Sequence, residues 1–203
     1  MITLFEGAPI ARLFEGKTGI SLLSVAELEQ GTLPEAQILF LPEYYQIDED
    51  MVPADLSAML VGVAEVCAPE LDRLPDGVFY YNFWPAPNAK LSVLEVVAQP
   101  NVLALLQDVL GRLDIGVVAA PATPGMIAPR VVAMIINEAH LLLQEGAASA
   151  ADIDLSMKLG TGYPLGPFEW EALVGVERVR ALLGAMAERE PEVIVPYWTV
   201  GSN

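Results

Sequence analysis

The sequence is poor in basic residues, cysteine and histidine. Ten Lys and Arg stand against 27 Asp and Glu in 203 residues, which gives a net charge of −17. Nucleic-acid-binding proteins carry a basic patch, so this balance argues against a nucleic-acid partner. One cysteine excludes an intrachain disulfide and a cysteine metal cluster, and one histidine disfavours a histidine metal site. We therefore expect no bound metal.

Uninterrupted hydrophobic runs are also missing, although 54% of the residues are hydrophobic. The most apolar stretch, residues 115–136, contains three prolines and an arginine, which disfavours a membrane helix. The N-terminus has Glu6 and no basic start, so a signal peptide is not expected. These features predict a soluble cytoplasmic protein without a membrane partner. A soluble chain this apolar also favours burial of surface against another subunit.

Residues 1–120 alternate short apolar runs with helix-like segments. Residues 53–74 and 101–113 have helical patterns, and 24–30 predict a short helix. The acidic residues 43–55 predict a solvated loop. Strands alternating with helices are typical of an α/β domain with a parallel sheet, here short by at least one strand–helix–strand unit. The predicted strands are residues 2–5, 19–24, 36–42, 77–83 and 115–121.

The pattern changes near residue 121, and the remaining sequence predicts only helices. Pro129 fits the first turn of a long helix, and Ser149 with Asp152 forms a start similar to a capping box. The predicted helices are residues 129–146 and 149–160, one beginning at Pro167, and 176–190. We therefore expect two domains, an α/β domain over 1–120 and a helical domain over 121–203.

Five short motifs in the second half occur together in one known family. They are TPG (123–125), NEA (137–139), DID (152–154), MKLGTGYPLGPFE (157–169) and LVG (173–175). In this arrangement they resemble the C-terminal domain of 3-hydroxyacyl-CoA dehydrogenases. The resemblance implies a reduced Rossmann-like α/β domain followed by a helical dimerisation domain of that type. It also implies a homodimer formed through residues 124–203, because family members typically dimerise through the helical domain.

Members of this family oxidise a 3-hydroxyacyl-CoA to the 3-ketoacyl-CoA with NAD, using a His base that a Glu orients. A weaker resemblance aligns the family's strand with YNFWPAPNAKLSVLEVV when Pro85-Ala86-Pro87 and Lys90-Leu91 are matched. The catalytic His position then holds Tyr81. The Glu position holds Val93, unless a two-residue slip brings in Glu95. Tyr81 and Glu95 are therefore weak catalytic candidates.

The same alignment replaces several of the family's substrate contacts. The Asn after the aromatic residues becomes Trp84, and the Asn-Arg pair of the helical domain becomes Pro129-Arg130. The resemblance thus indicates Tyr81, Trp84, Lys90, Pro129 and Arg130 as residues of a substrate site or cleft. A tyrosine could replace the base only with a cation nearby, because its pKa is ordinarily about 10.

The glycine-rich loop that cradles a dinucleotide is absent. No G-x-G-x-x-G occurs in residues 1–120, and FEGAPIARLFEG (5–16) is the sole candidate for the first turn. We therefore expect no cofactor, or NAD if the chain is an active enzyme. His140, the sole histidine, lies on an apolar helix face and reads as a satisfied core or interface residue.

Three functions remain open. The first is a 3-hydroxyacyl-CoA dehydrogenase-like pseudoenzyme that has lost standard hydride transfer and acts as a dimeric binding or partner subunit, with an acyl or CoA-type ligand. The second is an active NAD-dependent enzyme of fatty-acid or butanoate metabolism with substituted catalytic residues. The third is a purely structural interaction module.

Overall fold

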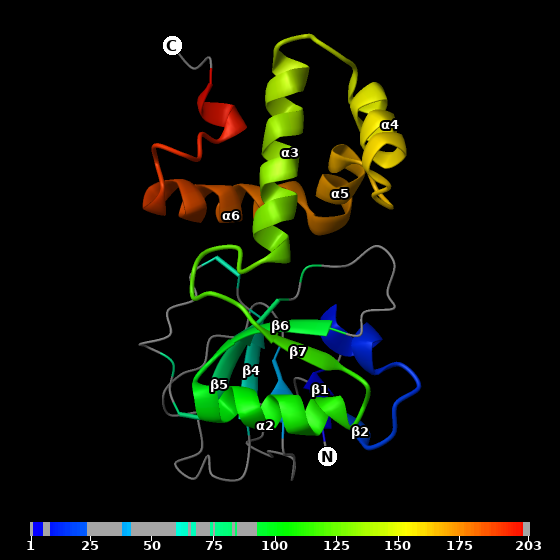
Figure 1. The fold of residues 1–203 in the computed structure, drawn as a ribbon, viewed down its shortest axis with the longest axis vertical. Helices are drawn as coiled ribbons and strands as arrows, with labels where there is room; N and C mark the ends of the chain where they lie inside the picture. Colours follow the sequence, from blue (N-terminus) through cyan, green and yellow to red (C-terminus); the bar gives the residue numbers. More distant parts are fainter. Residues whose placement is uncertain are drawn as a thin grey trace. The chain divides into compact units, whose positions relative to one another are not determined.

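The computed structural model of the chain contains two compact units (Figure 1). One unit holds a seven-stranded sheet and helix α2 (Pro100–Gly111), and the other holds helices α3 to α6 together with Trp84. An α/β unit followed by a helical unit is the order that the sequence predicts. Among the described residues, no helix is long and apolar enough to cross a membrane. The structure describes residues 2–5, 9–23, 38–41, 60–64, 66–67, 74, 76–82, 84 and 93–200.

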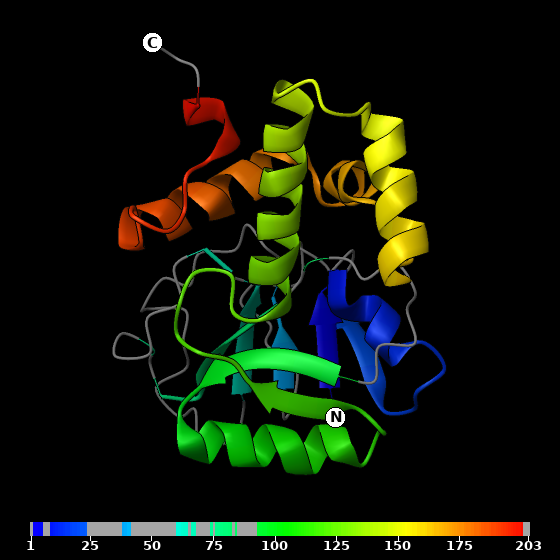
Figure 2. The same cartoon turned by 45° about the horizontal axis from the view of Figure 1, so that its top comes forward.

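The sheet has the strand order β2-β1-β3-β4-β5-β6-β7. Strands β1 to β5 are parallel, β6 runs antiparallel to β5, and β7 is parallel to β6. Helix α2 connects β6 to β7 and packs along both strands, as Figure 2 shows. The strands are β1 (Ile2–Phe5), β2 (Ile20–Leu23), β3 (Ile38–Phe40), β4 (Leu60–Ala64), β5 (Val78–Tyr81), β6 (Val93–Ala98) and β7 (Gly116–Ala119).

One predicted element of the sheet unit is wrong. The segment 53–74 was expected to be helical, but Leu60–Ala64 forms strand β4 in the centre of the sheet. An apolar run of five residues does not distinguish a buried strand from a buried helix turn, and its β-branched valines favour the strand. Strand β6 was not predicted either. The short helix over 24–30 and the acidic loop over 43–55 fall outside the described residues.

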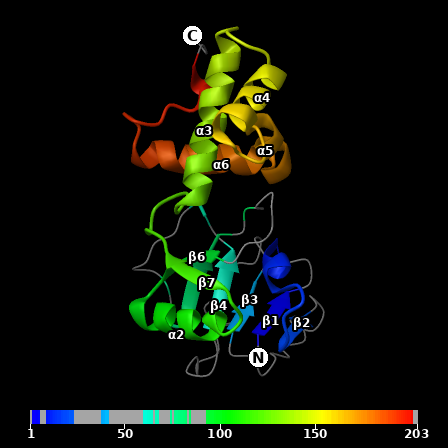
Figure 3. The same cartoon turned by 45° about the vertical axis from the view of Figure 1, so that its right-hand side comes forward.

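The helical unit follows the sequence prediction closely. Pro129 lies in the first turn of α3 (Ala128–Gln144), and the Ser149 hydroxyl accepts a hydrogen bond from the Asp152 N–H at the start of α4 (Ala150–Thr161). Helix α4 ends at Gly162, whose φ of 74° is left-handed. Helices α5 (Pro167–Val174) and α6 (Val176–Arg189) complete the unit, and α6 lies crosswise to α3 in Figures 1 and 3.

The DID and GYPLGPFE motifs build the connection from α4 to α5. The Asp154 carboxylate accepts a hydrogen bond from the Phe168 N–H at 2.9 Å, which satisfies a free donor at the start of α5. Gly166 lies so close to Asp154 that an added Cβ would overlap it. The Gly166 N–H donates to Glu169, and Lys158 forms an ion pair with the same carboxylate. The motif that carries the resemblance therefore has a structural role.

Candidate functional site

Tyr81, which the resemblance aligns with the catalytic His, is part of the core of the sheet unit. It is the last residue of β5 and its exposed fraction is 0%. Its hydroxyl donates a hydrogen bond of 2.5 Å to the backbone carbonyl of Leu41, which follows β3. Strand β4 lies between β3 and β5, so the phenol spans one intervening strand. The hydroxyl proton is thereby committed to a backbone acceptor.

Tyr81 and three phenylalanines form what we call the aromatic cluster (Phe14, Phe40, Phe79 and Tyr81), in which Phe40 and Phe79 contact Tyr81 and Phe14 contacts Phe40. The ring centroids of Phe40 and Tyr81 are 5.3 Å apart in an edge-to-face arrangement. Phe14 and Phe79 each lie 5.6 Å from Phe40. Gly62 in β4 provides the space, because an added Cβ would come within 2.5 Å of the Phe79 ring.

The aromatic cluster lies where open α/β sheets usually bind ligands. Phe40 and Tyr81 are the last residues of their strands, and β1 has β2 on one side and β3 on the other. Ligands of such sheets bind beyond the carboxyl ends of the strands, where the strand order reverses. Phe40 and Tyr81 place buried aromatic rings at the last positions of β3 and β5.

The described residues after β1 do not fit a dinucleotide cofactor. In the usual arrangement a glycine-rich turn leads into an α-helix whose N-terminus holds the pyrophosphate. Here the next described element is the 3₁₀-helix η1 (Pro9–Phe14), which has six residues. Phe14, the last residue of η1, packs its ring against Phe40 of the aromatic cluster. We derive no reaction step through NAD from these residues.

The other site residues predicted for the first half of the sequence are Trp84, Lys90 and Glu95. Trp84 is buried and belongs to the helical unit, whereas Tyr81 belongs to the sheet unit. Glu95 is half-buried on β6, and its backbone carbonyl accepts a hydrogen bond from the Asn82 N–H at 3.1 Å. Lys90 lies outside the described residues.

Pro129 and Arg130 lie in the first turn of α3, as predicted. Pro129 is buried, and the Arg130 guanidinium forms an ion pair of 2.8 Å with Glu190, just after α6. Gly125 supports this turn with a φ of 88°, and its carbonyl accepts the Arg130 N–H. Arg130 thus joins two segments of the helical unit.

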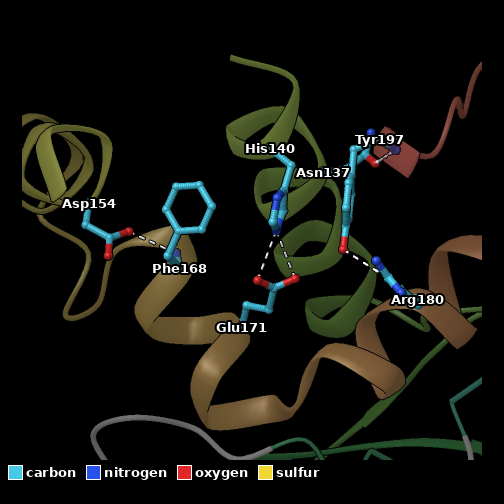
Figure 4. A network of polar contacts seen from close by, with 7 residues as sticks. All are labelled: Asn137, His140, Asp154, Phe168, Glu171, Arg180 and Tyr197. Atoms are coloured by element: carbon cyan, nitrogen blue, oxygen red, sulfur yellow. Dashed lines mark hydrogen bonds and ion pairs between the residues drawn. The ribbon is translucent and has the colours of Figure 1, made fainter. Parts of the chain in front are cut away.

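The most extensive polar network of the described residues surrounds His140 on α3 (Figure 4). The Nε2 atom of His140 lies 3.0 and 2.9 Å from the two carboxylate oxygens of Glu171 on α5. Their side chains are only 19% and 14% exposed. An ionised carboxylate only accepts hydrogen bonds, so the tautomer that fits this contact is the one with hydrogen on Nε2. This arrangement agrees with the expectation of a satisfied histidine.

Tyr197 closes the network from the segment that follows α6. Its ring stacks on the His140 ring at 3.9 Å and 9°, and Phe168 meets the imidazole edge-on at 5.0 Å. The Tyr197 hydroxyl accepts from Arg180 Nε at 3.2 Å, and this bond raises the pKa of Arg180. Asn137 accepts the Tyr197 N–H at 2.8 Å. Figure 4 shows the imidazole between the rings of Phe168 and Tyr197.

Sequence reasoning singled out His140 but missed its partners. Glu171 is 31 residues away from His140, and no spacing rule joins residues of different helices. The available signal was modest: Glu171 is an acid in the short, otherwise mostly apolar helix α5. A carboxylate that orients an imidazole is a common arrangement for a general base, but here Glu171 and Tyr197 hold the ring inside the helical unit.

Comparisons with known proteins place this helical unit in a family. The model of the 3-hydroxyacyl-CoA dehydrogenase C-terminal domain matches residues 125–199. The mitochondrial hydroxyacyl-coenzyme A dehydrogenase of Mus musculus is 38% identical over 120 residues, which are 57% of this chain and 37% of the relative. The 3-hydroxyadipyl-CoA dehydrogenase of Escherichia coli is 55% identical over 60 residues, 30% of this chain and 13% of the relative.

Solved structures extend the likeness of fold to both units. The (S)-3-hydroxybutyryl-CoA dehydrogenase of Ralstonia eutropha has a TM-score of 0.73 at 14% identity, covering 98% of this chain and 90% of that one. A reduced Rossmann-like domain followed by a helical domain is therefore confirmed as the fold. The matched region spans little more than a third of the mouse relative. The family model over residues 125–199 and these relatives support a C-terminal domain of the 3-hydroxyacyl-CoA dehydrogenase type in this chain.

Proposed function

We propose that this chain is a family member without the standard NAD-dependent hydride transfer, and that it acts as a dimeric binding or partner subunit. The observation that carries the proposal is the state of Tyr81. The residue aligned with the catalytic base is fully buried and donates its proton to the Leu41 carbonyl. It is neither free to accept a proton nor open to a substrate.

Loss of the catalytic base would lower the rate of hydride transfer strongly. A positioned general base contributes about 10²–10⁴ to the rate, and it works best when its pKa lies near the operating pH. Tyrosine ordinarily titrates near pH 10. A phenol bonded to a buried carbonyl therefore does not supply the missing base.

The cofactor region supports the same proposal. The sequence has no glycine-rich fingerprint, and six residues of 3₁₀-helix follow β1 instead of an α-helix among the described residues. The aromatic cluster packs at the carboxyl ends of β3 and β5. A net charge of −17 gives a pyrophosphate no long-range attraction. We therefore propose that no dinucleotide is held in the family's manner.

The helical unit supports a role in association and binding. We propose a homodimer formed through residues 124–203, as the family resemblance implies. Leu155 and Leu159 lie on one face of α4 and are 52% and 78% exposed, so they offer an apolar contact to a partner subunit. The names of the relatives contain hydroxyacyl, hydroxyadipyl and hydroxybutyryl-CoA, so an acyl or CoA-type ligand is the class we propose.

An NADH fluorescence titration tests the central part of this proposal. We expect no saturable enhancement under conditions where an intact family dehydrogenase binds NADH. Saturable binding by this chain would mean that a cofactor site exists despite the missing loop. Denaturing mass spectrometry of the purified protein tests the ligand class, for which an acyl or CoA species is the expected result and its absence favours a structural role. Light scattering tests the dimer, and a monomer at all concentrations would contradict it.

A further inference from the structure

The segment after α6 returns to α3 and is held there by side chains. We call residues 190–200 the C-terminal strap. Helix α3 presents Arg130, Asn137 and Gln144 two helical turns apart, so these side chains share one face. Each of them contacts the strap. A polar stripe of α3 therefore runs beneath it.

Asn137 makes the central contact. Its side chain is buried, its Nδ2 donates to the Val195 carbonyl at 3.0 Å, and its Oδ1 accepts the Tyr197 N–H at 2.8 Å. Gln144 donates to the Tyr197 carbonyl at 3.1 Å, and Arg130 pairs with Glu190 at 2.8 Å. These are contacts of side chains with a peptide segment, not the continuous ladder that joins strands.

The strap buries Ile194, Pro196 and Tyr197 and leaves its valines exposed. Ile194 and Tyr197 are inside, at 1% and 5% exposed. Val193, Val195 and Val200 point outward, at 70%, 48% and 49% exposed. Its recorded backbone–backbone bonds are local, such as Ile194 N–H to the Glu190 carbonyl. Segments with few buried contacts and local bonds open at a lower free energy than the core beneath them.

Tyr197 of the strap covers the imidazole of His140. The two rings stack at 3.9 Å, and the Glu171 carboxylate lies at the edge of the imidazole, 2.9 Å from Nε2. Glu171 and Phe168 come from α5, and Arg180 of α6 is held by the Tyr197 hydroxyl. Undocking of the strap uncovers the His140–Glu171 pair and the Asn137 amide, and it releases the Gln144 amide from the Tyr197 carbonyl.

From these contacts we infer that the C-terminal strap is a separately opening cover over the His140–Glu171 pair, while helices α3 to α6 stay folded. The opened face offers an oriented imidazole beside two amide side chains. Such a face recognises an extended peptide segment carrying an aromatic ring, because that is the chemistry of its present occupant. Access to the histidine is thus controlled by the strap.

Hydrogen exchange measured on the full chain tests this inference. We expect the Tyr197 amide to exchange faster than amides in the middle of α3, such as that of Ile136. Asn137→Ala should accelerate exchange of the Ile194 and Thr199 amides about ten- to a hundredfold, because a buried N–H and C=O lose their partner. Gln144→Ala should accelerate the Tyr197 amide about two- to tenfold.

Matched controls and a chemical probe complete the test. Ser149→Ala removes the cap of α4 and should leave strap exchange unchanged. His140 is the sole histidine, so its modification by diethyl pyrocarbonate should quicken with Asn137→Ala and not with Ser149→Ala. If Asn137→Ala does not fold, the test rests on Gln144→Ala, a change at an exposed position, measured by the same exchange and histidine modification. Strap amides that exchange in step with Ile136 would overturn the inference, and an accelerated strap with unchanged histidine reactivity would overturn its control of access.

Discussion

Removal of the Tyr81 hydroxyl separates a structural tyrosine from a catalytic one. In Tyr81→Phe the Leu41 carbonyl loses its 2.5 Å partner, and Leu41 is only 4% exposed, so water does not readily replace it. A buried acceptor left without a partner costs about 1–3 kcal/mol. The ring packing against Phe40 stays the same. We therefore expect the free energy of unfolding of the sheet unit to fall by about 1–3 kcal/mol.

Urea unfolding followed by circular dichroism measures this effect. With a slope of about 2 kcal/mol/M, the midpoint of the transition should fall by about 0.5–1.5 M. Tyr163→Phe is the matched control, because Tyr163 is 38% exposed and packs its ring against Trp170. That change should stay within about 0.5 kcal/mol. A Tyr81→Phe variant that unfolds at the wild-type midpoint would refute the reasoning. The Tyr81 hydroxyl would then make no contribution to stability, and a catalytic role would be open to it.

The remaining predictions concern the packing and charge of both units. Gly62→Ala should lower the unfolding free energy of the sheet unit by about 1–3 kcal/mol, because the added methyl group would overlap the rings of Phe79 and Phe40. Gly111→Ala is the control, since the space around Gly111 is open and no loss is expected. Urea unfolding of the two variants distinguishes these outcomes. Asp154→Ala should lower the unfolding free energy of the helical unit by about 0.5–2 kcal/mol through the lost α5 cap, and an unchanged midpoint would contradict the cap. The hydrogen bond from Lys158 lowers the pKa of Glu169 below its ordinary value of 4.5. Glu169 therefore stabilises the fold above pH 4.5, and this contribution is lost as the pH falls through the lowered pKa. In Glu169→Gln the melting temperature should fall less steeply than in the wild type as the solution is acidified.

The helical unit could be predicted because its signals are local. Proline in the first turn of α3 and the Ser149 cap of α4 each act within a few residues, and both helices begin next to them. The stop was predicted at Gly160, whereas α4 runs on to Thr161 and is capped by Gly162. The role of Gly166 could not be predicted from spacing. It depends on a close approach to Asp154 that only the folded turn brings about.

The sheet unit was harder to predict from the sequence, because strands buried on both faces do not show the alternation of apolar and polar residues that identifies a strand. The run at Leu60–Ala64 is apolar on both faces, so it carries no alternation that identifies a strand. Gly62 in this strand gives room to the Phe79 ring, a role that depends on the folded sheet. Tyr81 could be aligned with the catalytic position from sequence, but its bond to Leu41 joins residues 40 apart and could not be foreseen.

The polar network of the helical unit was the least predictable feature. His140 was expected to be satisfied, and it is, but by Glu171 and Tyr197 from other segments. Arg130 was placed by the resemblance at a substrate cleft, and the structure records its ion pair with Glu190. Such pairings depend on how α5, α6 and the C-terminal strap cross α3, which no single helix encodes.

Oxidation of NADH in the presence of acetoacetyl-CoA tests the central claim most directly. The purified full chain is compared with an intact family dehydrogenase at equal concentration, and the decay of NADH absorbance is followed. The buried, hydrogen-bonded Tyr81 and the missing glycine-rich loop predict a rate indistinguishable from that without protein. Turnover close to that of the intact dehydrogenase would contradict the account and identify this chain as a working enzyme with substituted catalytic residues.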